Sequence, residues 1–226
     1  MFDNYKVVII GISETLGNML VRSFLECGAF VIGADKSEPD FKSDKFRFIR
    51  FNSEDVQETE ALCKEINDCF SGHLDILINA LSLHIDVDLL EVNAQIFSSC
   101  FSAQLFNVID INRKLYPLLR ESETGNPSVV NIGSSSSRMN SVDVGLECLY
   151  SLALIKLSRI QAGSYSGVRC NSISPSRMEN TEDFQSIVDT VLFLCSEDGG
   201  FITGTDILID QGKSAKNSAR LESKND

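Results

Sequence analysis

The stretch KVVIIGISETLG, residues 6–17, decides the fold of this chain. Its run of aliphatic side chains predicts a strand over Lys6–Ile10 that is buried on both faces, because a half-exposed strand would alternate apolar and polar residues. A glycine follows the strand, and apolar residues at helical spacing predict a helix over Leu16–Cys27, which Gly28 ends. A buried strand, a glycine turn and a helix form the first half of a βαβ unit.

Segments typical of strands and helices continue to alternate along the chain. The further expected strands are Ala29–Gly33, Phe46–Phe51, Leu74–Ile78, Val129–Ile132, Val168–Ile173 and Ile207–Ile209. The further expected helices are Asp55–Phe70, one or two long helices within Leu89–Leu119, Leu149–Ala162 and Asp183–Leu194. This alternation predicts a single doubly wound α/β domain with a parallel sheet of about seven strands. We expect the domain to span residues 1–212 and residues 213–226 to form a flexible polar tail.

Composition and charge limit the classes of function. The chain has 226 residues, of which 43% are hydrophobic, and this is enough for one well-buried domain. Its net charge of −12 argues against a nucleic-acid partner, because neutralising phosphates needs clustered lysine and arginine. The sequence contains no run of about 18 apolar residues that would cross a membrane, and its N-terminus lacks the pattern of a signal peptide.

The cysteines and histidines do not have the spacing of metal ligands. The seven cysteines are dispersed without CxxC pairs, which is typical of reduced thiols in the cytoplasm. His73 and His84 are expected on the surface or in loops and not as ligands. We therefore expect a cytoplasmic protein without a metal site, a membrane partner or a nucleic-acid partner.

The turn after the first strand has features of a phosphate-binding loop. Gly11 and Gly17 are spaced like the first and last glycines of a turn whose N–H groups approach a pyrophosphate at a helix N-terminus. The middle position holds Thr15, which crowds that path, and Glu14 adds a negative charge. A tight turn with close helix–strand packing explains the same two glycines.

The second strand is followed by a carboxylate. Asp35 lies where it can accept both ribose hydroxyls of NAD and repel the 2′-phosphate of NADP, although Lys36 partly blurs that preference. An ordinary turn or helix-capping aspartate is the alternative interpretation.

These features and four later segments, in this order, resemble the short-chain dehydrogenase/reductase family over nearly the whole chain. The later segments are LDILINAL (74–81), VVNIGS (129–134), VRCNSISP (168–175) and FITGTDILIDQG (201–212). The resemblance implies a Rossmann-like fold, an NAD(P)(H)-linked oxidoreductase acting on a carbonyl or alcohol, and a homodimer or homotetramer. It adds Asn79 to Gly11, Gly17 and Asp35 as a cofactor-binding residue.

The resemblance also implies two catalytic residues, Ser134 and Tyr150. In the family a serine and a tyrosine bind the substrate carbonyl, and the tyrosine transfers the proton. A lysine four residues after the tyrosine lowers its pKa and holds the ribose. Ser137 lies thirteen residues before Tyr150, which is the commoner spacing, whereas the strand register favours Ser134, so the choice of serine stays open.

The departures from the family pattern concern its chemistry. Leu154 occupies the lysine position, and Lys156 lies about 240° around the helix from Tyr150. Gln104 stands where the family has an asparagine that supports a water relay. The turns Asn79-Ala-Leu-Ser and Pro175-Ser replace the family's Asn-Asn-Ala-Gly and Pro-Gly.

Two interpretations follow from these departures. The first is a divergent oxidoreductase with weak or lost activity, using NAD rather than NADP or binding no dinucleotide. The second is a non-catalytic pseudoenzyme that acts as a binding, scaffolding or partner subunit, paired with an active homologue. The short segment between Pro175 and Ile187 leaves little chain for a substrate lid and supports either interpretation.

Overall fold

Seven strands form one parallel sheet in the computed structural model, which describes residues 1–53, 55–81, 88–138, 145–176 and 181–216. The strands are β1 (Lys6–Ile10), β2 (Phe30–Asp35), β3 (Phe46–Arg50), β4 (Ile76–Asn79), β5 (Ser128–Ile132), β6 (Arg169–Pro175) and β7 (Asp206–Ile209). Their order is β3-β2-β1-β4-β5-β6-β7, and every neighbouring pair is parallel. The predicted doubly wound α/β fold is confirmed.

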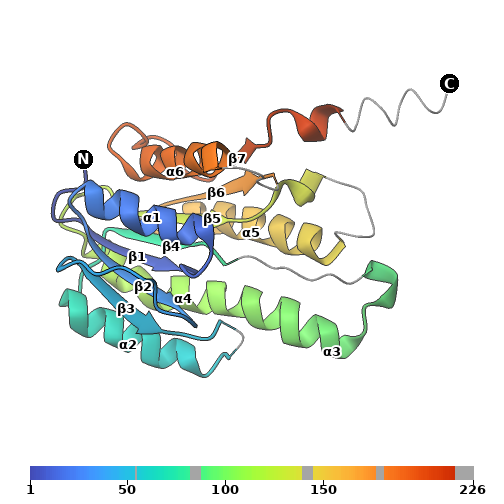
Figure 1. Cartoon of the computed structure of the whole chain (residues 1–226), viewed down its shortest axis with the longest axis horizontal. Coiled ribbons are helices and arrows are strands. Elements are labelled where there is room, and N and C mark those ends of the chain that lie inside the picture. The colour runs from blue at the N-terminus through green and yellow to red at the C-terminus, as the bar shows by residue number, and fades with distance from the viewer. Residues whose placement is uncertain (54, 82–87, 139–144, 177–180, 217–226) are drawn as a thin grey trace.

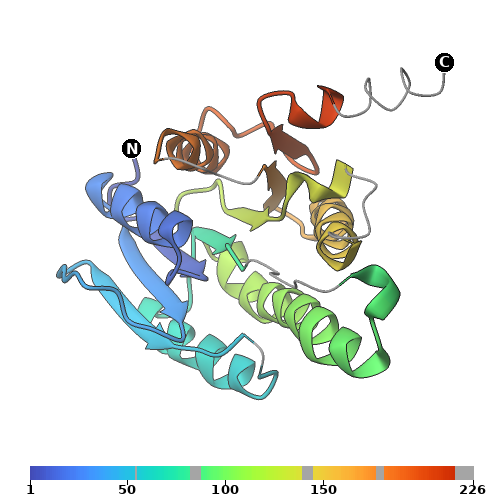
Figure 2. The same ribbon diagram turned by 45° about the vertical axis from the view of Figure 1, so that its right-hand side comes forward.

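Helices cover both faces of the sheet (Figures 1 and 2). The longer helices are α1 (Thr15–Glu26), α2 (Glu58–Phe70), α4 (Ala103–Arg120), α5 (Gly145–Ser164) and α6 (Thr181–Cys195). Helices α1 and α6 lie on one face, whereas α2, α4 and α5 lie on the other. None of these helices, within the described ranges, is long and apolar enough to cross a bilayer.

Strand β1 contributes to a hydrophobic cluster on each face. Val8 and Ile10 belong to the cluster under α2, α4 and α5, and Val7 and Ile9 belong to the cluster under α1 and α6. All four side chains are 0% exposed. Successive side chains of a strand point to opposite faces, so a strand covered by helices on both sides must be apolar throughout.

The expectation of one or two long helices within Leu89–Leu119 is met by one, α4. Only α4 is a long helix there, and it follows the short elements η1 (Leu89–Glu91), α3 (Ala94–Ile96) and the π-helical η2 (Phe97–Ser102). The Asn93 side chain accepts hydrogen bonds from the N–H groups of Gln95 and Ile96, which starts a helix at that point. A local cap and a change of helical pitch therefore divide a segment whose apolar pattern is continuous.

The expected tail begins with an ordered turn. Lys213 to Lys216 are helical, and the Ser214 N–H donates to the Asp210 carboxylate at 2.9 Å. The rest of the expected tail, 217–226, lies outside the described residues.

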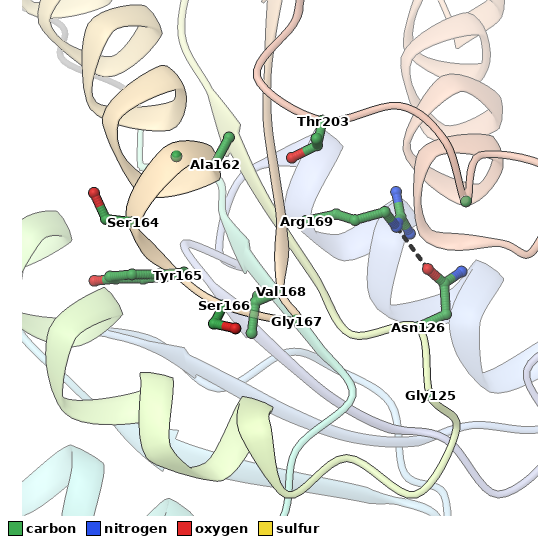
Figure 3. A pocket seen from close by; sticks show the side chains of 12 residues that line it. Gly125, Asn126, Ala162, Ser164, Tyr165, Ser166, Gly167, Val168, Arg169 and Thr203 are labelled. Atoms are coloured by element: carbon green, nitrogen blue, oxygen red, sulfur yellow. Dashed lines mark hydrogen bonds between the residues drawn. The ribbon is translucent and has the colours of Figure 1, made fainter.

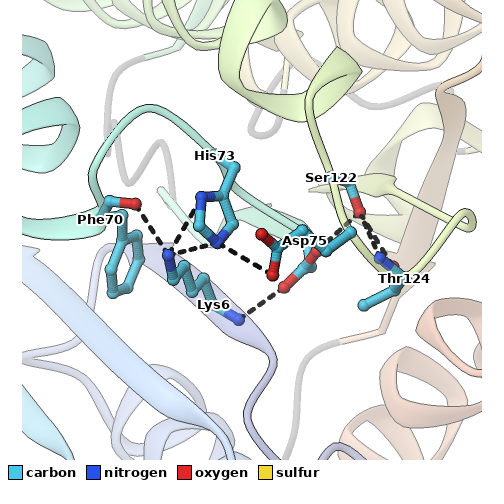
Figure 4. A network of polar contacts seen from close by, with 7 residues as sticks. Lys6, Phe70, His73, Asp75, Ser122 and Thr124 are labelled. Carbon is cyan, nitrogen blue, oxygen red and sulfur yellow. Dashed lines mark hydrogen bonds and ion pairs between the residues drawn. The ribbon is translucent and has the colours of Figure 1, made fainter.

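A polar network joins the amino ends of β1 and β4 to the loop after α4 (Figure 4). Asp75, 2% exposed, accepts from the Lys6 N–H at 2.8 Å and from the Ser122 hydroxyl at 2.6 Å. The Lys6 ammonium donates to the Phe70 carbonyl at 2.8 Å and contacts the ring of His73. His73 lies in a loop, as expected, and its ring is part of this network.

We expect Asp75→Ala to lower the free energy of unfolding by about 1–3 kcal/mol, because the substitution leaves the partly buried Lys6 N–H and the Ser122 hydroxyl without this acceptor. Urea denaturation measures the change. Asp40→Ala, at an exposed carboxylate, is the control and should change stability by less than about 0.5 kcal/mol. Equal effects of the two substitutions would contradict a structural role for the network.

Candidate functional site

The sheet brings most of the predicted site residues to one edge. Gly11, Asp35, Asn79 and Ser134 lie at or just after the carboxyl ends of β1, β2, β4 and β5. In a parallel sheet these ends share one edge, and ligands bind at that edge where the strand order reverses. Here the order reverses between β1 and β4.

The two glycines of the first turn are required by packing. Gly11 has φ +90°, and a Cβ there would lie 2.6 Å from the Ala80 carbonyl oxygen. A Cβ on Gly17 would lie 2.0 Å from the Gly11 carbonyl oxygen. The chain after β4 lies too close to Gly11 for a side chain there, and the turn after β1 lies too close to Gly17, so packing suffices to explain both glycines. Thr15 is the first residue of α1.

Asp35 is held by the first turn. Its Oδ2 accepts from both the N–H of Ser13, at 2.8 Å, and the hydroxyl of Ser13, at 2.7 Å. Its Oδ1 accepts from the N–H of Lys36 at 2.6 Å. The carboxylate thus faces the loop between β1 and α1, which is the position that an adenosine ribose needs.

Asn79 belongs to a buried amide network between the sheet and the helices α4 and α5. It is 2% exposed, and its Nδ2 donates to Asn112 and Asn131, each at 2.8 Å. Asn112 in turn donates to Gln161 at 3.1 Å, and Asn131 donates to Ser158 at 2.9 Å. Sequence reasoning missed these four partners. The signal was present, because Asn131 is a lone amide in the apolar strand β5.

Tyr150 is a core side chain. It is 2% exposed, its hydroxyl has no hydrogen-bond partner among the described residues, and its ring packs edge-on against Phe101 at 6.2 Å. Burial raises the pKa of Tyr150 far above its ordinary value, and no neighbouring charge among the described residues lowers it. Leu154, 1% exposed, packs in the same hydrophobic cluster.

Two basic residues that flank Tyr150 in the sequence, Lys156 and Arg138, do not lower the pKa of the phenol. Lys156 is exposed on α5, as expected from its angle around the helix. Arg138 pairs with Asp206 at 3.3 Å, and the Asp206 side chain is only 1% exposed. Ser172 and Ser174 also donate to Asp206, at 2.9 and 2.8 Å. Arg138 therefore neutralises a buried carboxylate on β7.

The serine run forms a 3₁₀ turn, η3 (Ser135–Arg138), over the end of β5. The Ser134 hydroxyl accepts from the Ser136 N–H at 3.1 Å and so caps the turn. Several buried side-chain oxygens have no partner among the described residues; on η3, α4 and α5 they belong to Gln104, Ser136, Ser137, Tyr150 and Ser151. This geometry leaves both Ser134 and Ser137 as candidates for the site serine.

A separate cavity of about 510 Å³ lies at the opposite, amino edge of the sheet (Figure 3). It is lined by Asn126, Tyr165, Arg169 and Thr203, among others. Arg169 donates to the carbonyls of Leu194 and Gly199 at 2.7 and 3.0 Å and to the Asn126 side chain at 2.7 Å, which fastens β6 to the end of α6. Its buried position lowers the pKa of Arg169. Arg169 therefore has a structural role: it joins β6 to the end of α6 and to the loop before β5.

Three expectations concern residues beyond those described. His84 and Ser82 lie within 82–87, and the short lid segment includes 177–180. Among the described residues, no three histidine, cysteine or acidic side chains are grouped so that they could hold a metal ion.

Comparison with known proteins identifies the family. A model of the short chain dehydrogenase family matches residues 5–191. The chain belongs to the short-chain dehydrogenase family.

Individual relatives of this short-chain dehydrogenase are distant but extend over most of the chain. A chloroplastic tropinone reductase homolog of Arabidopsis thaliana is 26% identical, over 94% of this chain and 76% of that protein. Meso-2,3-butanediol dehydrogenase of Serratia marcescens is 23% identical, over 95% of this chain and 96% of that protein. A short chain dehydrogenase from Leptospira borgpetersenii, solved with bound NAD⁺, superimposes with a TM-score of 0.79 at 23% identity and 94% coverage of both chains.

The residues present fit one half of the family's NAD cofactor better than the other. The adenosine half would find a carboxylate, Asp35, beside a turn whose glycines allow the backbone to come close. The nicotinamide half would find oxygens on Ser137 and Tyr150 that no described residue binds, but an apolar Leu154 where the family has its lysine. The roles of all these residues as site residues stay predictions.

We expect Tyr150→Phe to raise the free energy of unfolding by about 1 kcal/mol, because it removes a buried hydroxyl that has no partner among the residues that the structure describes. Urea denaturation measures the change. Tyr165→Phe is the matched control: the Tyr165 hydroxyl accepts from Gln161 at 3.4 Å, so its loss should destabilise by about 1 kcal/mol. A loss of stability above about 1 kcal/mol in Tyr150→Phe would show that the phenol has a partner.

Proposed function

We propose that this short-chain dehydrogenase retains the adenosine part of an NAD cleft and has little or no tyrosine-driven oxidoreductase activity. The observation that carries the proposal is the buried pair Tyr150 and Leu154, 2% and 1% exposed. A phenol acts in proton transfer at neutral pH only when its pKa is lowered towards that range. Here burial raises the pKa of Tyr150, and leucine supplies no charge against it.

The other residues of the candidate site also support a low oxidoreductase activity. NAD, when bound, supplies hydride transfer, and the chain's own residues bind it, orient it and transfer the proton. Asp35 would hold the ribose and disfavour a 2′-phosphate, which supports NAD over NADP. Ser134 or Ser137 would contact a carbonyl or alcohol substrate. Loss of one member of a cooperating catalytic unit commonly lowers the rate by orders of magnitude.

We expect the purified protein to oxidise NADH with small aldehydes or ketones at a rate at least about 10³-fold below that of an active short-chain dehydrogenase. We also expect Tyr150→Phe to leave any residual rate unchanged. Absorbance at 340 nm measures both. Turnover that Tyr150→Phe abolishes would disprove the proposal.

Leu154→Lys is the matched variant in that experiment. It places an amine in an apolar cluster, so we expect lower stability by about 2 kcal/mol or more and no gain in turnover. A gain would mean that the lysine alone limits activity and that the remaining site is sound.

A second role, as one subunit of an assembly, is favoured by the exposed apolar face of α4 and α5. Phe106 and Ile109 on α4 are 51% and 39% exposed. On α5 the exposed fractions are 45% for Leu149, 45% for Leu152 and 54% for Ile160, and the helical period places these three on one face. We propose a second copy of the chain as the partner, and an active homologue as the alternative.

The dispersed thiols support a cytoplasmic location.

We expect a concentration-dependent dimer in sedimentation velocity, and a shift to monomer in Leu152→Glu, because a charge at the centre of an apolar contact is costly to bury. Leu90→Glu, at a residue that is 84% exposed on η1, is the control and should leave the dimer intact. A monomer at all concentrations would rule out the homodimer.

A further inference from the structure

Ser13 donates two hydrogen bonds to the Asp35 carboxylate, which a ribose would need as an acceptor. Both donors of this exposed residue, its N–H and its hydroxyl, bind the same oxygen of Asp35, at 2.8 and 2.7 Å. A carboxylate oxygen has two lone-pair positions in its plane. Oδ2 is therefore fully used by the chain, and Oδ1 already accepts from the Lys36 N–H at 2.6 Å.

A ribose brings two adjacent hydroxyl donors to this carboxylate, so at least one existing hydrogen bond has to open. The N–H groups of Ser13 and Lys36 are fixed by the backbone, which is tightly packed at Gly11 and Gly17. The Ser13 hydroxyl is different, because rotation about a single side-chain bond moves it to solvent. It is the donor whose displacement disturbs the least structure.

We infer that the Ser13 hydroxyl is an internal substitute for a ribose hydroxyl on Asp35, and that it weakens the binding of ligands carrying an adenosine 2′,3′-diol. The inference rests on the proposed function, since it assumes that Asp35 receives NAD. Ser13 is thus an affinity-determining residue. The preference against a 2′-phosphate comes from the negative charge of Asp35, and the Ser13 hydroxyl does not contribute to it.

The consequence for binding has a defined sign. Removing the hydroxyl adds a second open acceptor position on Asp35 to the one already open on Oδ1, so the two ribose hydroxyls no longer displace a charge-assisted hydrogen bond. We expect Ser13→Ala to bind NAD⁺ about two- to ten-fold more tightly than the natural chain, which corresponds to one net hydrogen bond. Isothermal titration calorimetry with NAD⁺ measures the two dissociation constants.

Two further variants separate this effect from others. Ser13→Thr keeps the hydroxyl and should keep the natural affinity, whereas Asp35→Ala removes the acceptor and should weaken NAD⁺ binding both in the natural chain and in the Ser13→Ala variant. NADP⁺ has a phosphate in place of the 2′-hydroxyl and should gain less than NAD⁺ from Ser13→Ala. Thermal unfolding of each variant without ligand controls for folding.

Three results would overturn the inference. Unchanged or weaker NAD⁺ binding by Ser13→Ala would show that the hydroxyl positions Asp35 or does nothing, and would leave the proposed function intact. Equal tightening in Ser13→Thr would assign the effect to the loop and not to the hydroxyl. If neither the natural chain nor Ser13→Ala binds NAD⁺ at millimolar concentration, the proposed function fails together with the inference.

Discussion

The burial of β1 on both faces is the constraint on which the rest of the structure depends. Val7 and Ile9 need cover on one side, and Val8 and Ile10 need cover on the other, so helices must pack against both faces of the sheet. Parallel neighbours on each side of β1 then require crossovers in opposite directions. The strand order reverses beside β1. The polar residues Asp35 and Asn79 lie at the carboxyl ends of β2 and β4, the two neighbours of β1.

The first turn illustrates how packing and function can require the same residues. Gly17 allows α1 to approach the turn after β1, Gly11 allows that turn to approach the chain after β4, and no side chain fits at either position. A phosphate-binding turn needs glycine there for backbone access. The glycines therefore cannot distinguish a working cofactor site from a retained fold. The discriminating residues lie elsewhere: Leu154, where the family pattern has a lysine, and the exposed Ser13.

The sequence predicted the strands and the shared edge better than the partners of individual side chains. Period-two and helical patterns are local, so Lys6–Ile10 and the order of elements could be read directly. The contact of Ser13 with Asp35 joins residues 22 positions apart, and that of Asn79 with Asn131 joins residues 52 apart. Such pairings depend on strand register and helix packing, which no local pattern contains. The change of helical pitch before α4 likewise interrupts a continuous apolar pattern without a local signal.

Leu154 affects both the charge near Tyr150 and the burial of its ring. With an apolar neighbour, the phenol ring joins the hydrophobic cluster, and burial favours its neutral form. One turn further along α5, Ser158 donates to the Leu154 carbonyl and accepts from Asn131, so the Ser158 hydroxyl is satisfied within the protein. Ser158 and Asn131 thus join α5 to the sheet, while Asp35 keeps an exposed, displaceable partner in Ser13. Packing alone accounts for the hydrogen bonds of Ser158 and Asn131. The Asp35 carboxylate differs, because the Ser13 hydroxyl that it binds can rotate away and be replaced by a hydroxyl of a ligand.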